Sequence, residues 1–181
     1  AEFNPRGNDV PVILDLMIHD LDIILSLIKS EIKNIHANGV KIVSPTVDIA
    51  NARIEFKNGC VANLTASRIS QKSMRKMRLF QEKDYITIDF QEGILEEYKI
   101  CNNPPIPKNG DQVVELNGKE KKYILYRKPS VPKHDALKEE LIHFVDSIQN
   151  VKQPETDGIS ATEALSLALE IQKIIDQQTN F

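Results

Sequence analysis

The chain has 181 residues, of which 41% are hydrophobic and 27% charged, a composition typical of one globular domain with its own core. The net charge is −3 and no basic patch with interleaved aromatic residues occurs, which argues against nucleic acid as a partner. No run of about 18 apolar residues is present, so no membrane span is expected. The two cysteines, Cys60 and Cys101, form neither a C-x-x-C pair nor a disulfide framework, and we therefore expect reduced thiols in a cytoplasmic protein.

The first predicted element is a helix within residues 9–28. At about 100° per residue, one narrow stripe carries the polar side chains of Asp15, His19, Asp22 and Ser26, and nearly all other positions are aliphatic. A helix that is apolar almost all round is usually buried, and a buried charge needs a partner or a ligand. We therefore expect Asp15 and His19 to face an enclosed cavity, where the carboxylate could fix the tautomer of the imidazole.

Short segments of alternating polarity follow the helix and predict eight strands. The turn Lys57-Asn58-Gly59 is of the kind that joins antiparallel neighbours. The strand 47–56 has one apolar and one half-polar face, and the second face suits water or a subunit interface. The proline-rich segment 102–110 is predicted to be a loop. The predicted strands cover residues 32–43, 47–56, 60–67, 74–81, 85–90, 94–100, 113–116 and 122–127.

Helical spacing returns in the last third of the chain. Residues 137–148 carry one apolar stripe, residues 153–158 interrupt it, and Ser160 with Glu163 forms a capping box that predicts the start of a final helix. The order of helix, strands and two helices contains no βαβ alternation. It predicts a single α+β domain over residues 1–181, with a largely antiparallel open sheet and helices packed on one face.

Several nucleotide-binding and catalytic motifs are absent from the chain. Its seven glycines form neither G-x-G-x-x-G nor a P-loop, and neither a G-x-S-x-G nor an H-E-x-x-H motif occurs. We therefore expect no residue of this chain to cradle the pyrophosphate of a dinucleotide.

The motif Asp15-x-x-x-His19-x-x-Asp22 in an apolar helix, followed by antiparallel strands, resembles the C-terminal domain of the glucose–fructose/inositol dehydrogenase superfamily (Gfo/Idh/MocA). The closing segment 135–148, with the Gly158-containing helix start after it, is similar to the end of that family's domain. The resemblance implies the substrate-binding and oligomerisation half of an NAD(P)-dependent dehydrogenase of sugars, cyclitols or nucleotide sugars. The N-terminal Rossmann domain, which would bind NAD or NADP, is absent from this chain.

The resemblance also implies roles for individual residues. His19 would be the acid/base that exchanges a proton with the substrate hydroxyl, and Asp15 would orient it or contact the sugar. Apart from the resemblance, Arg68 is predicted at a strand end after the small residues Ala66-Ser67, where it could bind a phosphate or carboxylate of the substrate. Arg6 and Asn8, in the loop that enters the helix, could line the same cleft or belong to a mobile end of the chain. The segment Ala66-Ser-Arg68 looks closest to the branch that acts on nucleotide-linked N-acetyl sugars. No metal ligand is implied, and a homodimer or tetramer through the open sheet face is expected.

Two departures from the family pattern bear on activity. The family's Glu-Lys-Pro lysine, which lies beside the nicotinamide, has no counterpart here, so the fragment alone is expected to be inactive. Met17 stands where many members have glycine, and it could reshape the pocket.

Alternative interpretations remain open at this point. The chain could be a non-catalytic binding or dimerisation module with the same fold. His19 could be a structural histidine, and Arg68 could form a surface ion pair. A metal site at Asp15, His19 and Asp22 is disfavoured, because one helix would supply every ligand.

Overall fold

The computed structural model describes residues 9–70, 73–118, 120–132, 135–154 and 156–178. The chain divides into two compact units, the first formed by Ala1–Lys72 with His143–Phe181 and the second by Ser73–Ile142. The interpretation of residues 1–181 as one domain stays a prediction.

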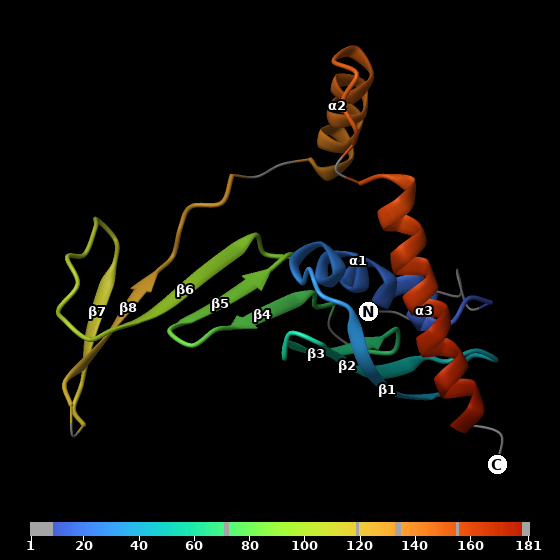
Figure 1. The fold of residues 1–181 in the computed structure, drawn as a ribbon, viewed down its shortest axis with the longest axis horizontal. Coiled ribbons are helices and arrows are strands. Elements are labelled where there is room, and N and C mark those ends of the chain that lie inside the picture. Colours follow the sequence, from blue (N-terminus) through green and yellow to red (C-terminus); the bar gives the residue numbers. More distant parts are fainter. Residues whose placement is uncertain (1–8, 71–72, 119, 133–134, 155, 179–181) are drawn as a thin grey trace. The chain divides into compact units, whose positions relative to one another are not determined.

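The first unit is a three-stranded antiparallel sheet, in the order β1-β2-β3, with helices on one face (Figure 1). The first helix of this unit begins with a short π-helix, which continues directly into the first α-helix. The elements of this unit are η1 (Ile13–Met17), α1 (Ile18–Leu27), β1 (Ile32–Val40), β2 (Ile49–Phe56), β3 (Val61–Ser67) and α3 (Gly158–Gln178).

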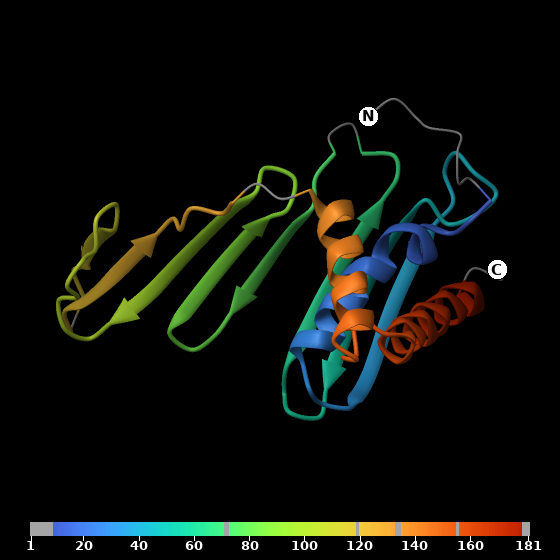
Figure 2. The ribbon, with the colours of Figure 1, turned by 90° about the horizontal axis from the view of Figure 1, so that it is seen from above.

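Alternation along the strands decides which face of this sheet is covered. The predicted apolar face of β2 is buried, and α1 and α3 pack over it (Figure 2). The helices contribute buried side chains to the same core, so one continuous cluster joins sheet and helices. Its fully buried large members include Ile13, Met17, Leu21, Ile54, Phe56, Ile171 and Ile175.

Gly39 in β1 allows α3 to approach the sheet. A Cβ atom built on this glycine would lie 2.7 Å from Val47 Cγ1 and 3.1 Å from Ile175 Cγ2. Side-chain carbons do not come as close as the first of these distances. The strand therefore needs glycine here for packing.

Replacing Gly39 with alanine is expected to lower the free energy of unfolding by about 1–3 kcal/mol, because the added methyl group overpacks the α3–β1 contact. Denaturant titration of the variant measures this loss. Gly158→Ala is the matched control, because a Cβ at that position meets no atom within 4 Å. Equal stability of the two variants would contradict the packing role of Gly39.

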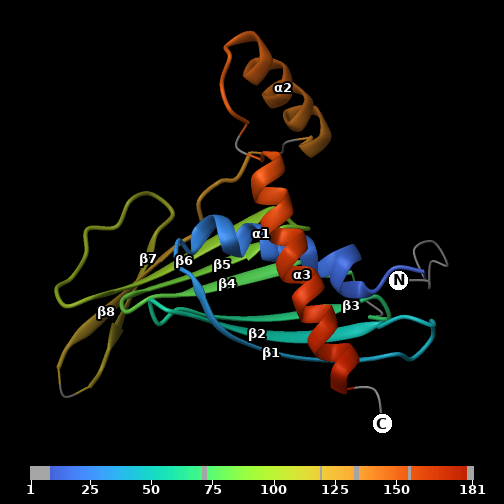
Figure 3. The same cartoon turned by 45° about the vertical axis from the view of Figure 1, so that its right-hand side comes forward.

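The second unit is a five-stranded antiparallel sheet in the order β4-β5-β6-β8-β7 (Figure 3). Directly paired residues of four neighbouring strands bring four aromatic rings into one row, with centroids 4.7 Å apart for Phe80 and Tyr85, 5.3 Å for Tyr85 and Tyr98, and 5.0 Å for Tyr98 and Tyr126. Such cross-strand pairs stabilise the register of a sheet. The strands are β4 (Lys76–Phe80), β5 (Asp84–Asp89), β6 (Ile94–Cys101), β7 (Gln112–Leu116) and β8 (Lys122–Arg127).

The remaining helix, α2 (Ala136–Gln149), spans the division between the two units. Its predicted apolar stripe is exposed, with Phe144 57% and Ile148 63% accessible. Within the described ranges, no helix combines the length and apolar character that crossing a membrane requires.

The predicted α+β class and all eight predicted strands are confirmed, with shifts of a few residues at their ends. Two details differ from prediction. The strands form two sheets instead of one, and the last helix begins at Gly158, before the predicted capping box. Its cap is Asp157, whose carboxylate accepts hydrogen bonds from the backbone N–H groups of Ile159 and Ser160 at 3.0 and 2.8 Å.

Candidate active site

The helix that carries Asp15 and His19 starts with a π turn. The backbone N–H of Ile18 donates to the carbonyl of Ile13, an i→i+5 hydrogen bond that closes η1, and α1 follows without a break. Single π turns inside α-helices are rare and occur frequently at functional sites. Asp15 lies in this turn, and His19 lies at the start of the regular helix that follows it.

The predicted burial of Asp15 and His19 is wrong. Both side chains are exposed, and neither has a hydrogen bond or ion pair in the part of the chain that the structure describes. The helix is instead two-sided, because its core contacts come from the opposite side, through Val12, Ile13, Met17 and Leu21. An assignment of function to Asp15 and His19 therefore cannot rest on enclosure within this chain.

The spacing i, i+4 brings side chains within reach of each other in a regular α-helix, but no hydrogen bond or ion pair joins Asp15 and His19 in the described structure. The role of Asp15 as the group that orients His19 stays a prediction. Met17 is fully buried in the core, so it does not line the exposed face and does not reshape a pocket there.

Sequence reasoning missed Asp48, a charged residue in the first unit whose side chain is completely buried. Its Oδ2 accepts hydrogen bonds from the backbone N–H groups of Ile42, Val43 and Ser44 at 2.6, 2.8 and 3.1 Å, and Oδ1 accepts one from the Ser44 hydroxyl at 2.6 Å. Burial raises the pKa of this carboxyl, but the Ser44 hydroxyl and the three N–H groups outweigh it and hold the pKa well below its usual range. Asp48 is therefore ionised and stabilises the loop before β2.

Arg68 belongs to the same arrangement. Its Nε lies 3.8 Å from Asp48 Oδ1, and its Nη2 donates to the backbone carbonyl of Val10. The side chain is only 10% exposed, so the ion pair weighed against substrate binding exists and lies largely below the surface. Binding of a substrate anion by Arg68 stays a prediction.

The two other predicted site residues, Arg6 and Asn8, fall outside the residues that the structure describes. Across the described ranges, no group of three or more His, Cys, Asp or Glu side chains is placed to hold a metal ion. Asp15, His19 and Asp22 therefore do not form the metal site considered as an alternative.

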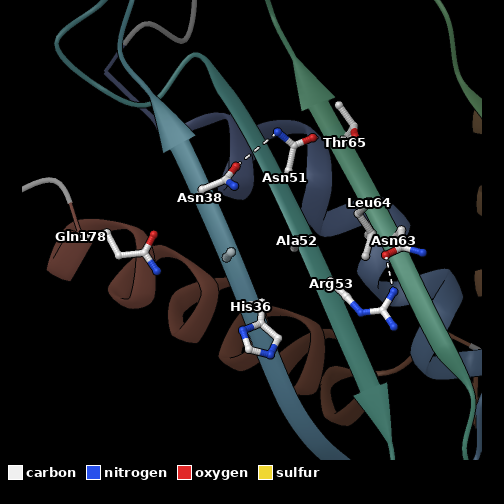
Figure 4. Close-up of a pocket in the computed structure, with 10 residues that line it drawn as sticks. His36, Asn38, Asn51, Ala52, Arg53, Asn63, Leu64, Thr65 and Gln178 are labelled. Atoms are coloured by element: carbon white, nitrogen blue, oxygen red, sulfur yellow. Dashed lines mark hydrogen bonds between the residues drawn. The ribbon is translucent and has the colours of Figure 1, made fainter.

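A hollow of about 440 Å³ lies over the polar face of β1–β3, and Gln178 at the end of α3 also lines it (Figure 4). Its polar side chains bond mainly to one another: Asn51 donates to Asn38 at 3.3 Å, Thr65 donates to Asn51 at 2.8 Å, and Arg53 donates to Asn63 at 3.2 Å. The half-polar face predicted from the sequence is thus a cross-strand ladder that stabilises the sheet. It is separate from the helix that carries His19.

Comparisons with known proteins cover nearly the whole chain. The UDP-N-acetylglucosamine 3-dehydrogenase of Acidithiobacillus ferrooxidans is 34% identical over 178 residues, which represent 97% of this chain and 52% of that protein. A solved structure of UDP-N-acetylglucosamine 3-dehydrogenase from the same organism matches with a TM-score of 0.82 at 32% identity, over 98% of this chain and 52% of that one. The structure of myo-inositol 2-dehydrogenase from Lactobacillus plantarum shares the fold, with a TM-score of 0.62 at 17% identity over 93% of this chain and 47% of that one.

The chain spans about half the length of the curated relative it matches. Residues 3–96 match the family model described as the GFO/IDH/MocA C-terminal domain, and this segment is slightly more than half of the chain. The matched segment includes η1, α1 and β1–β3, the elements that carry Asp15, His19, Asp48 and Arg68. The chain therefore belongs to the GFO/IDH/MocA family and corresponds to its C-terminal domain.

Proposed function

We propose that this chain is the substrate-binding half of an NAD(P)-dependent dehydrogenase that acts on a ring hydroxyl of a nucleotide sugar. The observation that carries the proposal is the two-sided first helix. One side is fixed in the core, and the other presents Asp15 in the π turn and His19 directly after it, neither with a side-chain bond among the described residues. The relative named as a UDP-N-acetylglucosamine 3-dehydrogenase supports the substrate class, since the similarity covers 97% of the chain.

The part of this chain in the reaction is proton transfer. Nicotinamide, when bound, would supply the hydride chemistry, but the sequence offers no Gly-rich turn for its dinucleotide. A ring nitrogen of His19 takes the proton of the substrate hydroxyl as it becomes a carbonyl, or returns it in reverse. Because His19 and Asp15 are exposed, we propose that a nucleotide-binding domain covers them and excludes water when the protein is whole.

The half-polar face of β1–β3 would serve assembly into a homodimer or tetramer. The protein would be cytoplasmic, a location that two free cysteines fit. The alternative is a binding or dimerisation module with the same fold and without catalysis. Catalytic activity of the whole protein separates the two.

The experiment is an assay of the whole protein with NAD⁺ and UDP-N-acetylglucosamine, in which formation of NADH is followed by absorbance. We expect turnover with the nucleotide sugar and much weaker turnover with free N-acetylglucosamine. Oxidation of neither compound, in a protein that is folded and binds NADH, would favour the non-catalytic module.

Residues 1–181 expressed by themselves are expected to show no change in thermal unfolding midpoint on addition of NADH. The physical reason is that a ligand raises the midpoint only if it binds the folded state, and this chain has no dinucleotide-binding turn. Differential scanning fluorimetry measures the shift, with the whole protein as positive control. A clear shift in the isolated chain would reveal a dinucleotide site that the sequence does not predict.

A further inference from the structure

We infer that the buried ion pair of Asp48 and Arg68 positions the helix start that carries Asp15 and His19, so that its integrity sets the rate of the proposed reaction. The inference rests on the proposed function for its kinetic arm. It assigns Arg68 a task other than binding the substrate, because the guanidinium group is turned toward the protein.

The pair first fixes the chain around itself. Asp48 gathers the backbone of residues 42–44 with its carboxylate, and its own N–H donates to the carbonyl of Val40 at 2.9 Å. The N–H of Arg68 donates to the Asp48 carbonyl at 3.1 Å. The end of β1, the start of β2 and the end of β3 are therefore joined at Asp48, through its backbone and its carboxylate.

The segment before η1 is hydrogen-bonded to residues around this ion pair at Val10 and Val12. The carbonyl of Val10 accepts hydrogen bonds from Arg68 Nη2 and, at 3.4 Å, from the hydroxyl of Thr46. The N–H of Val12 donates to the carbonyl of Val47 at 2.9 Å. Three residues thus hold the backbone directly before η1: Arg68, which is the ion-pair partner of Asp48, and Thr46 and Val47, which precede Asp48 in the sequence.

The next link reaches the proposed site. The carbonyl of Pro11, between the two fastened residues, accepts hydrogen bonds from the N–H groups of Leu14 and Asp15 at 3.0 and 3.1 Å. The first turn therefore starts from a residue whose neighbours on both sides are held by the ion-pair arrangement. A change at Asp48 moves this start, and a displacement of about 1 Å in catalytic geometry can lower a rate by about 100-fold.

The kinetic experiment compares Asp48→Asn with Phe56→Leu in the whole protein. Asparagine keeps the size of the side chain and removes its charge, whereas Phe56 is a buried core residue at the other end of β2, away from the helix start. We expect Asp48→Asn to lower kcat by about 10- to 100-fold with KM changed by less than about threefold, because geometry and not substrate affinity is lost. Phe56→Leu, matched in loss of thermal stability, is expected to keep kcat within about twofold.

Arg68→Lys keeps a positive charge near Asp48 but removes the hydrogen bond to Val10. It takes the place of Asp48→Asn in the kinetic comparison if Asp48→Asn does not fold. Lower kcat at constant KM supports positioning, and a raised KM with unchanged kcat overturns it in favour of a substrate ligand. Equal kcat for the Asp48 and Phe56 variants also overturns the inference.

A second measurement does not depend on activity. Hydrogen exchange of the whole protein reports protection of the N–H groups of Val12 and Asp15. We expect at least about tenfold faster exchange at these positions in Asp48→Asn than in Phe56→Leu, because the fastened backbone opens. Unchanged protection overturns the inference. If His19→Ala retains full turnover, the proposed function fails, and the exchange result still decides the positioning of the helix start.

Discussion

Replacing His19 with alanine is expected to lower turnover of the whole protein by about 10²- to 10⁴-fold, the usual contribution of a positioned general acid or base. The side chain is exposed and has no bonded partner in the described structure, so its loss leaves the core of the first unit intact. The free energy of unfolding should therefore change by less than about 0.5 kcal/mol. Steady-state kinetics with NAD⁺ and UDP-N-acetylglucosamine measures the effect.

The matched control is His36→Ala, an exposed histidine on β1 whose Nε2 lies 2.8 Å from the amide nitrogen of Asn34. It is expected to keep turnover within about twofold, as substitutions away from the proton path normally do. Turnover of His19→Ala within a few-fold of the unchanged protein would show that another group transfers the proton. The comparison of the two variants shows whether turnover depends on the imidazole at position 19 or falls on removal of any exposed histidine.

The strands were predictable because their signals are local. Alternation along β2 separates Ala52 and Ile54 from Asn51 and Arg53, and the structure buries the first pair and exposes the second. The turn at Asn58-Gly59 needs a left-handed residue, and Gly59 adopts φ of 88°. Each pattern needs only a few consecutive residues.

Properties of the site that depend on contacts distant in sequence were not predictable. Helical periodicity at 100° per residue assumes a regular helix, so it could not show the π turn that contains Asp15. Apolar residues such as Leu16, which is 40% exposed, made the helix look buried on every side. The ion pair of Asp48 joins a loop to a residue 20 positions later, and no local pattern marks such a pair.

Replacing Asp48 with asparagine is also expected to lower the free energy of unfolding by about 3 kcal/mol at neutral pH, because the guanidinium group of Arg68 loses its buried partner. Asparagine can still accept the N–H groups of residues 42–44 through its one oxygen, but its NH₂ group then faces Arg68. Denaturant titration measures the difference. The loss should exceed that from any exposed ion pair of the chain, since surface pairs contribute about 0–1 kcal/mol.

The pH dependence of this difference identifies its cause. The pKa of Asp48 is lower in the folded protein than the value of about 3.9 usual for an unfolded chain, so its ionised form stabilises the fold fully above that pH. As pH falls below about 4, the unfolded state binds a proton first, and this stabilisation is lost on the way to the lower folded pKa. The difference in free energy of unfolding between the unchanged protein and Asp48→Asn should therefore become smaller in acid.

Glu31→Gln, which removes the exposed ion pair with Lys57, is the control. It should lower the free energy of unfolding by less than about 1 kcal/mol at neutral pH. If the difference for Asp48→Asn stays constant down to the lowest pH at which the protein folds, the lost stability comes from packing and not from the charge of Asp48.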